Sequence, residues 1–206
     1  MQIENNLQVY DNVFPDVHKV REWALGLDFR SNDYQGQSFS NTAGDWGRFP
    51  VNLLSDLMGF KCEVVLSFVR ANLASDEPAK RPFIHCDQRV DGAEYAAVIY
   101  LTNTTLDRDN YSATAFWRHK ETGIANFPKD PNDLLRIGYD KDIFDKLNAD
   151  GFSEKNWQLE GLVRAVSNRM IIYPSLLFHS RYPDLTFGDK PENGRLIWCA
   201  FFREAA

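Results

Sequence analysis

From residue 62 onward the chain consists of short runs rich in β-branched, aromatic and aliphatic residues, separated by clusters of Gly, Pro, Asn and Asp. Short runs bounded by turn-forming residues predict β-strands. The predicted strands cover residues 62–70, 83–87, 94–101, 113–118, 157–166, 169–173, 176–181 and 195–202. Short strands without long helices between them favour a mainly β fold with flanking helices, a double-stranded β-helix of the jelly-roll or cupin-like type.

The remaining segments predict additions to this β fold. A strand is expected over residues 7–10, a helix after Pro15 over 17–27, a long loop over 31–50 and a short helix over 51–58 that Gly59 ends. No repeat, low-complexity tract or linker marks a second domain. We therefore expect one domain over residues 1–206, with a strand and helix lead-in over about 1–60 and a helical or irregular insertion over about 120–152.

Charge and composition exclude several classes. The 206 residues carry a net charge of −6, and no run of Lys or Arg exceeds two, so the basic stripe typical of nucleic-acid binding is absent. Three scattered cysteines without a C-x-x-C pair argue against a disulfide framework. No stretch approaches the roughly 20 apolar residues that span a bilayer, and no leader pattern opens the sequence. We expect a soluble cytoplasmic protein that binds no membrane.

Two distant segments together predict a metal site. His85-Cys86-Asp87 and His179 offer two imidazoles and one carboxylate. In an extended segment residues i and i+2 point to the same side, so His85 and Asp87 can bind one ion while Cys86 points away. Such a set occupies one face of an octahedral Fe(II) site and leaves three positions open. The alternative is a hydrogen-bonded pair at a strand end.

A candidate for cosubstrate binding lies near the C-terminus. Arg195 follows Gly194 and opens the apolar run of residues 196–202, where a charged side chain is costly without a partner. A guanidinium binds a carboxylate through two parallel charge-assisted hydrogen bonds. Arg195 is therefore predicted to bind the far carboxylate of 2-oxoglutarate, although an internal Asp or Glu would serve equally well.

Two other histidines rank lower as metal ligands. His119 and Glu121 have the same spacing as His85 and Asp87, but their polar surroundings are typical of a solvated strand end or a substrate-facing rim. His18 lies in the first predicted helix and is expected at the surface or in helix packing. Cationic rim residues would suit a carboxylate-bearing small molecule or an acidic peptide; the rim candidates are Arg89, Trp117, Arg118 and His119.

Over about residues 62–203 the chain resembles the iron(II)- and 2-oxoglutarate-dependent oxygenases of the prolyl-hydroxylase-like kind. The resemblance rests on five segments in the same order: His85-Cys86-Asp87, Tyr100-Leu101-Thr102-Asn103, Ser112-Ala113-Thr114-Ala115-Phe116, His179 and Arg195. Ser112-Ala113 stands where the family usually has Gly-Gly. The run Arg118-His119-Lys120-Glu121-Thr122-Gly123 is also similar to a motif of small bacterial proteins of uncharacterised function, which indicates no substrate.

The resemblance implies a dioxygenase that uses Fe(II) and 2-oxoglutarate to hydroxylate a C–H bond of a small molecule or peptidyl side chain. His85, Asp87 and His179 would hold the iron, and Tyr100 would donate its hydroxyl to the carboxylate that Arg195 binds. Two other classes stay open: a cupin-like metal-binding enzyme or sensor that does not use 2-oxoglutarate, and a non-catalytic module with a closed coordination sphere. Arg195 discriminates among them, since without a cosubstrate it should pair with an internal carboxylate.

Overall fold

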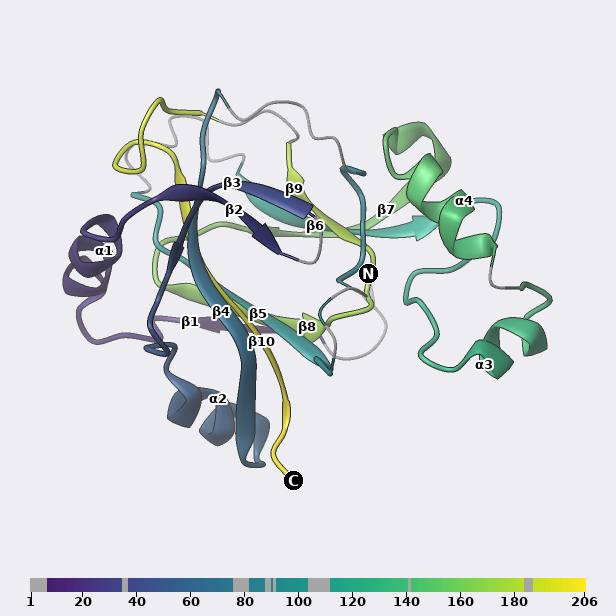
Figure 1. The fold of residues 1–206 in the computed structure, drawn as a ribbon, viewed down its shortest axis with the longest axis horizontal. Helices are drawn as coiled ribbons and strands as arrows, with labels where there is room; N and C mark the ends of the chain where they lie inside the picture. Colours follow the sequence, from purple (N-terminus) through teal and green to yellow (C-terminus); the bar gives the residue numbers. More distant parts are fainter. Residues whose placement is uncertain are drawn as a thin grey trace.

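Two antiparallel β-sheets face each other in the computed structural model, and short helices lie outside them (Figure 1). The structure describes residues 7–34, 37–75, 82–87, 90, 92–103, 112–140, 142–183 and 187–206. The larger sheet has the strand order β1-β8-β5-β10-β4-β3-β2, and the smaller sheet has the order β7-β6-β9. This arrangement confirms the predicted fold class, a mainly β double-stranded β-helix with flanking helices.

The elements have the following bounds. The strands are β1 (Gln8–Asp11), β2 (Arg30–Tyr34), β3 (Gln37–Gly44), β4 (Cys62–Asn72), β5 (Tyr95–Tyr100), β6 (Ala113–His119), β7 (Trp157–Arg164), β8 (Arg169–Pro174), β9 (His179–Tyr182) and β10 (Arg195–Glu204). The helices are α1 (Val17–Leu25), α2 (Val51–Met58), α3 (Pro131–Arg136) and α4 (Ile143–Asp150), with a 3-10 turn η1 (Glu154–Asn156). No helix within the described ranges is long and apolar enough to cross a membrane.

Strand β10 lies between β5 and β4 and is covered on both faces. Ile197, Cys199 and Phe201 pack in the core between the two sheets. Trp198 and Phe202 point the other way, into the core that α1 and α2 close over the outer face of the larger sheet. Because side chains alternate along a strand, Arg195 belongs to the row that faces the smaller sheet.

The segment predicted as an insertion forms two helices, α3 and α4, which lie together beyond β6 and β7 (Figure 1). Leu134, Ile143 and Leu147 of these helices pack in one cluster with Ala115 and Trp117 of β6. The insertion therefore packs against part of the outer face of the smaller sheet, where Leu159 and Leu162 of β7 stay exposed.

Three details differ from the sequence-based expectation. The predicted loop over residues 31–50 contains the β2-β3 hairpin, and its Thr42–Gly44 segment pairs with Phe68–Arg70 of β4. The predicted strand 83–87 is reduced to a single bridge at His85, and β9 begins only at His179. Strand pairing depends on a distant neighbouring strand, and the local sequence does not reveal that neighbour.

Candidate functional site

His85 lies within the connection between β4 and β5, and His179 is the first residue of β9. The two residues lie directly opposite each other. Their backbones exchange two hydrogen bonds, with His85 N donating to His179 O at 3.0 Å and His179 N donating to His85 O at 2.8 Å. The two ring centroids are 4.7 Å apart. Backbone pairing thus brings together the two histidines that the sequence analysis singled out.

Each imidazole is oriented by a backbone carbonyl two residues earlier. The Nδ1 atom of His85 is 3.0 Å from Phe83 O, and the Nδ1 atom of His179 is 2.8 Å from Leu177 O. A carbonyl oxygen only accepts, so each Nδ1 carries the proton and donates it. In the neutral imidazole this leaves the lone pair on Nε2, which is the arrangement that a metal-ligating histidine requires.

Asp87 completes the set. One carboxylate oxygen lies 3.9 Å from Nε2 of His85 and the other lies 3.4 Å from Nε2 of His179. Ligand atoms of the three residues all lie within 4.8 Å of one another. Metal bonds of about 2.1 Å place neighbouring octahedral ligand atoms about 3 Å apart. The observed separations are somewhat longer, so the three groups face a common point and would move inward to hold one cation. The Asp87 amide, which donates to Ser175 O at 2.8 Å, holds the segment in place.

Arg195 is buried, with 6% of its surface exposed, and its hydrogen bonds go to neutral acceptors. Its Nε donates to Ser112 Oγ at 3.0 Å and its Nη1 to Asn72 Oδ1 at 2.8 Å. Burial lowers the pKa of this guanidinium, which still stays charged. Among the described Asp and Glu residues none forms an ion pair with Arg195. A buried cation needs a counter-charge, which a bound anion can supply.

Tyr100 is fully buried beside Arg195. Its hydroxyl is 2.7 Å from Thr114 Oγ1, which also accepts a long hydrogen bond of 3.5 Å from Nη2 of Arg195. The guanidinium carbon lies 5.7 Å from the centroid of the Tyr100 ring. Burial raises the pKa of the phenol, so the hydroxyl keeps its proton as a donor.

Two buried residues between the histidines and Arg195, Tyr173 and Cys199, were not predicted from the sequence. The Tyr173 ring lies 4.9 Å from the ring of His179, and burial, with the charge of Asp87 as the next cause, raises its pKa well above the ordinary value. Burial raises the pKa of the Cys199 thiol to about 12. The strand alternation in residues 169–173 and 195–202 could have placed both side chains on one face, but no motif marks either of them.

The rival histidine has a structural role. His119 is 1% exposed, with Nε2 at 3.1 Å from Asp150 Oδ2 and Nδ1 at 3.1 Å from Thr122 Oγ1. Glu121, the other half of the rival pair, instead binds Lys146 of α4 at 2.9 Å. His119 therefore anchors the insertion, and the expectation of a solvated rim histidine was wrong because α4 covers it.

Of the other rim candidates, Trp117 differs from expectation. Trp117 is buried and its Nε1 donates to Ser180 Oγ at 2.9 Å, so it is a core residue. Arg118 forms a two-pronged pair with Glu160, at 3.0 and 3.1 Å. Arg89 lies outside the described residues. His18 is exposed on α1, as predicted.

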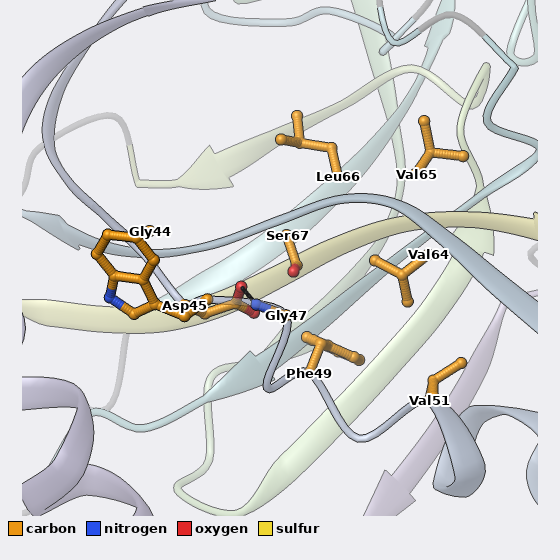
Figure 2. Close-up of a pocket in the computed structure, with 10 residues that line it drawn as sticks. Gly44, Asp45, Gly47, Phe49, Val51, Val64, Val65, Leu66 and Ser67 are labelled. Carbon is orange, nitrogen blue, oxygen red and sulfur yellow. Dashed lines mark hydrogen bonds between the residues drawn. The ribbon is translucent and has the colours of Figure 1, made fainter.

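A pocket elsewhere on the larger sheet is separate from these residues. Figure 2 shows it between the segment from Gly44 to Val51 and residues 64–67 of β4. Trp46 stands at its end with 88% of its surface exposed and a positive φ of 55°. The residues that line it include none of His85, Asp87, His179 and Arg195.

Comparisons with known proteins agree with the fold. A profile described as "Family of unknown function (DUF6445)" matches residues 51–202. No curated protein matches the sequence. The non-heme alpha ketoglutarate dependent epimerase SnoN from nogalamycin biosynthesis is similar in structure, with a TM-score of 0.57 and 12% identity over 98% of this chain and 79% of its own.

A second similar structure is HygX from Streptomyces hygroscopicus with nickel, 2-oxoglutarate and hygromycin B bound. It has a TM-score of 0.50 and 13% identity over 97% of this chain and 83% of its own. At these identities the two likenesses show a shared fold.

Proposed function

Because the chain belongs to the family of unknown function DUF6445, its function has to be inferred from its site, and we propose that it is an Fe(II)- and 2-oxoglutarate-dependent oxygenase. One observation carries the proposal: Nε2 of His85, Nε2 of His179 and the carboxylate of Asp87 converge to within 4.8 Å. Two neutral imidazoles and one carboxylate are the ligand set of non-heme Fe(II) oxygenases, which leave positions open for cosubstrate and dioxygen.

The cosubstrate assignment is supported by Arg195. Its guanidinium lies in the same core as Tyr173, whose ring contacts His179, and the positive charge of Arg195 acts on Tyr173 and Cys199. 2-Oxoglutarate has a keto acid end that chelates a metal and a second carboxylate at the other end. Arg195 would bind that second carboxylate through its charged donors, and Tyr100 would add a neutral donor.

The residues of the chain would bind, orient and shield the reactants. Bound iron with 2-oxoglutarate would use dioxygen for oxidative decarboxylation of the cosubstrate to succinate and CO₂, with one oxygen atom entering succinate and the other oxidising a substrate C–H bond. The backbone bonds of His85 and His179 hold the two imidazoles in position, and the buried side chains of Tyr173, Cys199 and Phe116 exclude water from the inner wall. Hydroxylation of a small molecule or peptidyl side chain is the outcome we propose.

The similar structures support a small-molecule substrate. SnoN is described as an epimerase, and HygX was solved with hygromycin B and 2-oxoglutarate bound. Since an epimerase shares this fold, the proposal for this chain covers hydroxylation first and another oxidation of a C–H bond second. The prolyl-hydroxylase-like resemblance points to the same cofactors.

The alternative of a cupin-like enzyme or sensor that does not use 2-oxoglutarate requires another partner for Arg195. Among the described residues the hydrogen-bond partners of Arg195 are hydroxyl, amide and carbonyl oxygens. That alternative therefore leaves a buried positive charge without compensation. The same observation disfavours a non-catalytic module.

Two measurements test the proposal. Under nitrogen, the Fe(II)-loaded protein should bind 2-oxoglutarate and develop the visible absorption of an iron–keto acid chelate. In air, it should release succinate when incubated with a panel of amino acids, peptides and metabolites. Failure to bind 2-oxoglutarate in the presence of iron would exclude the proposed function and favour the cupin-like alternative.

A further inference from the structure

The pocket beside β4 lies on the outer face of the larger sheet (Figure 2). Val64 and Ser67 of β4 line it, and they lie opposite residues of β10 that pack in the core of this outer face. Strand β3 pairs with β4 only over Phe68–Arg70, so in the part of the chain that the structure describes no strand adjoins residues 64–67 on this side. The space has a volume of about 490 Å³, which is typical of small-molecule sites.

Asp45 in the wall of this pocket is a buried carboxylate without a nearby cation. It is 2% exposed, and one of its oxygens accepts a hydrogen bond from Gly47 N at 3.1 Å while the other accepts one from Trp198 Nε1 at 2.7 Å. Among the described residues these two neutral groups are its side-chain partners. The guanidinium of Arg48, the next basic residue along the chain, lies instead 5.8 Å from the centroid of the Trp23 ring. A buried charge needs compensation, and a cation in the pocket would supply it.

Trp46 lines the same pocket in a conformation that tryptophan rarely adopts. Its φ is 55° and that of Gly47 is 71°, so two consecutive residues are left-handed. This region strains any residue that carries a Cβ atom. The indole is nevertheless left in solvent, with 88% of the surface of Trp46 exposed. Strain and the exposure of a large apolar ring both disfavour folding, and strained residues of this kind gather where a protein binds a ligand.

We propose that this pocket binds a small organic cation, an ammonium or guanidinium group on an aliphatic stem. Asp45 would provide the counter-charge, since a carboxylate shielded from water attracts a cation over several ångströms. The indole face of Trp46 would stabilise the cation through its π electrons. The apolar side chains of Val51 and Val64 would contact the stem.

The backbone of β4 favours a small molecule over an extended peptide as the occupant. The register of β4 with β10 shifts between Phe201 and Phe202, so Val65 is an extra residue, a β-bulge, at the floor of the pocket. A bulge disrupts the regular ladder of hydrogen bonds that an added strand would extend. No residue of the pocket belongs to the proposed metal or cosubstrate site, so the inference does not depend on the proposed function.

Binding of simple cations tests the pocket. The full-length protein, with Fe(II) and 2-oxoglutarate added under nitrogen, is titrated by calorimetry with butylammonium, with butylguanidinium and with neutral butanol at about pH 7, where both cations stay protonated. At least one cation should bind, roughly tenfold or more tightly than butanol. Nα-acetyl-lysine N-methylamide carries the same ammonium group on a peptide backbone and should bind no better than butylammonium.

Variants of the two pocket residues locate the binding. Trp46→Ala should weaken cation binding roughly three- to thirtyfold, and Trp46→Phe, which keeps an aromatic face, should retain part of the affinity. Asp45→Asn should weaken it roughly tenfold. Because Asp45 also accepts two hydrogen bonds, the thermal midpoint of Asp45→Asn is measured first, and Trp46→Ala, whose side chain is exposed, provides the test if Asp45→Asn does not fold. Asp145→Asn removes an exposed carboxylate of α4 and should leave cation affinity unchanged.

The inference is overturned if neither cation binds or if butanol binds as tightly as the cations. Unchanged cation affinity in Trp46→Ala would place the binding elsewhere, and an equal loss in Asp145→Asn would reduce it to general charge attraction. Tighter binding of the lysine amide than of butylammonium would assign the pocket to a peptide.

Discussion

His85 and His179 are joined by two reciprocal backbone hydrogen bonds of 3.0 and 2.8 Å, and each imidazole donates its Nδ1 proton to the carbonyl oxygen two residues before it. Four hydrogen bonds thus fix the two residues: two join backbone segments far apart in the sequence, and two orient the imidazoles locally. The orientation of both Nε2 atoms is therefore a property of the folded chain and does not require a bound metal.

His179→Ala should abolish Fe(II) binding without unfolding the protein. The substitution keeps the backbone hydrogen bonds with His85 but removes one of the three proposed ligands. Mutation of a residue that only supports a metal ligand typically lowers metal affinity 10–100-fold, so loss of a ligand should lower it further. We expect Fe(II) affinity, measured by anaerobic titration, to fall at least about a hundredfold. An unchanged affinity would mean that the metal lies elsewhere.

His119→Ala is the matched control, because His119 is the other buried histidine in a pair with a carboxylate. Its hydrogen bonds to Asp150 and Thr122 hold the insertion on β6. Losing them should cost about 1–3 kcal/mol of the free energy of unfolding, measured in urea, with Fe(II) affinity unchanged. The opposite pattern, metal loss in His119→Ala with retention in His179→Ala, would move the site to the rival pair.

Asp87→Gly should abolish 2-oxoglutarate turnover without unfolding the protein. The Asp87 amide still donates to Ser175 O in this variant, and the lost carboxylate is the proposed iron ligand. The thermal midpoint should shift by only about 2–4 °C, the change that 1 kcal/mol produces in a domain of this size. Asp87→Asn, which keeps the shape and removes the charge, should be similarly inactive, and retained turnover in both variants would exclude Asp87 as the iron carboxylate.

Arg195→Lys should weaken 2-oxoglutarate binding far more than iron binding. Lysine keeps the charge but cannot reproduce the paired donors of the guanidinium. We expect a loss of about 1.5–3 kcal/mol, roughly ten- to a hundredfold in the dissociation constant under nitrogen. Tyr100→Phe should give a smaller loss of the same kind. Equal 2-oxoglutarate affinity in wild type and Arg195→Lys would contradict the cosubstrate assignment.

The parts of this site that the sequence predicted are those marked by residue type and spacing. His85 and Asp87 are two residues apart in an extended segment. His179 ends one apolar run, and Arg195 is a charged residue at the start of another. These features are local, and the sheet pairing then brings them together. The predicted roles of these residues, and of Tyr100 as a cosubstrate ligand, stay predictions for the experiments above.

The parts that the sequence did not predict depend on strand register. Tyr173 and Cys199 carry no motif in the sequence, and the pairing of β8 and β10 with β5 is what places both on the inner face. His119 is buried because α4 packs over it. Its sequence neighbours are polar, so the sequence alone does not indicate this burial. The sequence of residues 31–50 predicts a loop in place of the β2-β3 hairpin. These residues show no periodic pattern that would indicate the pairing of β3 with β4.

The thiol of Cys199 is buried on the inner face of β10. Its pKa is raised from the ordinary 9.0 to about 12, mainly by burial. Between these values the unfolded chain releases a proton that the folded chain retains, so the free energy of unfolding should decrease as pH rises above about 9, by up to about 1.4 kcal/mol per pH unit from this group. Cys199→Ala lacks this dependence. Urea unfolding at pH 8 and at pH 10.5 should therefore show the wild type losing roughly 2 kcal/mol more than the variant, since other alkaline effects cancel in the comparison. Parallel losses in the two proteins would show that the thiol ionises in the folded state as readily as in water.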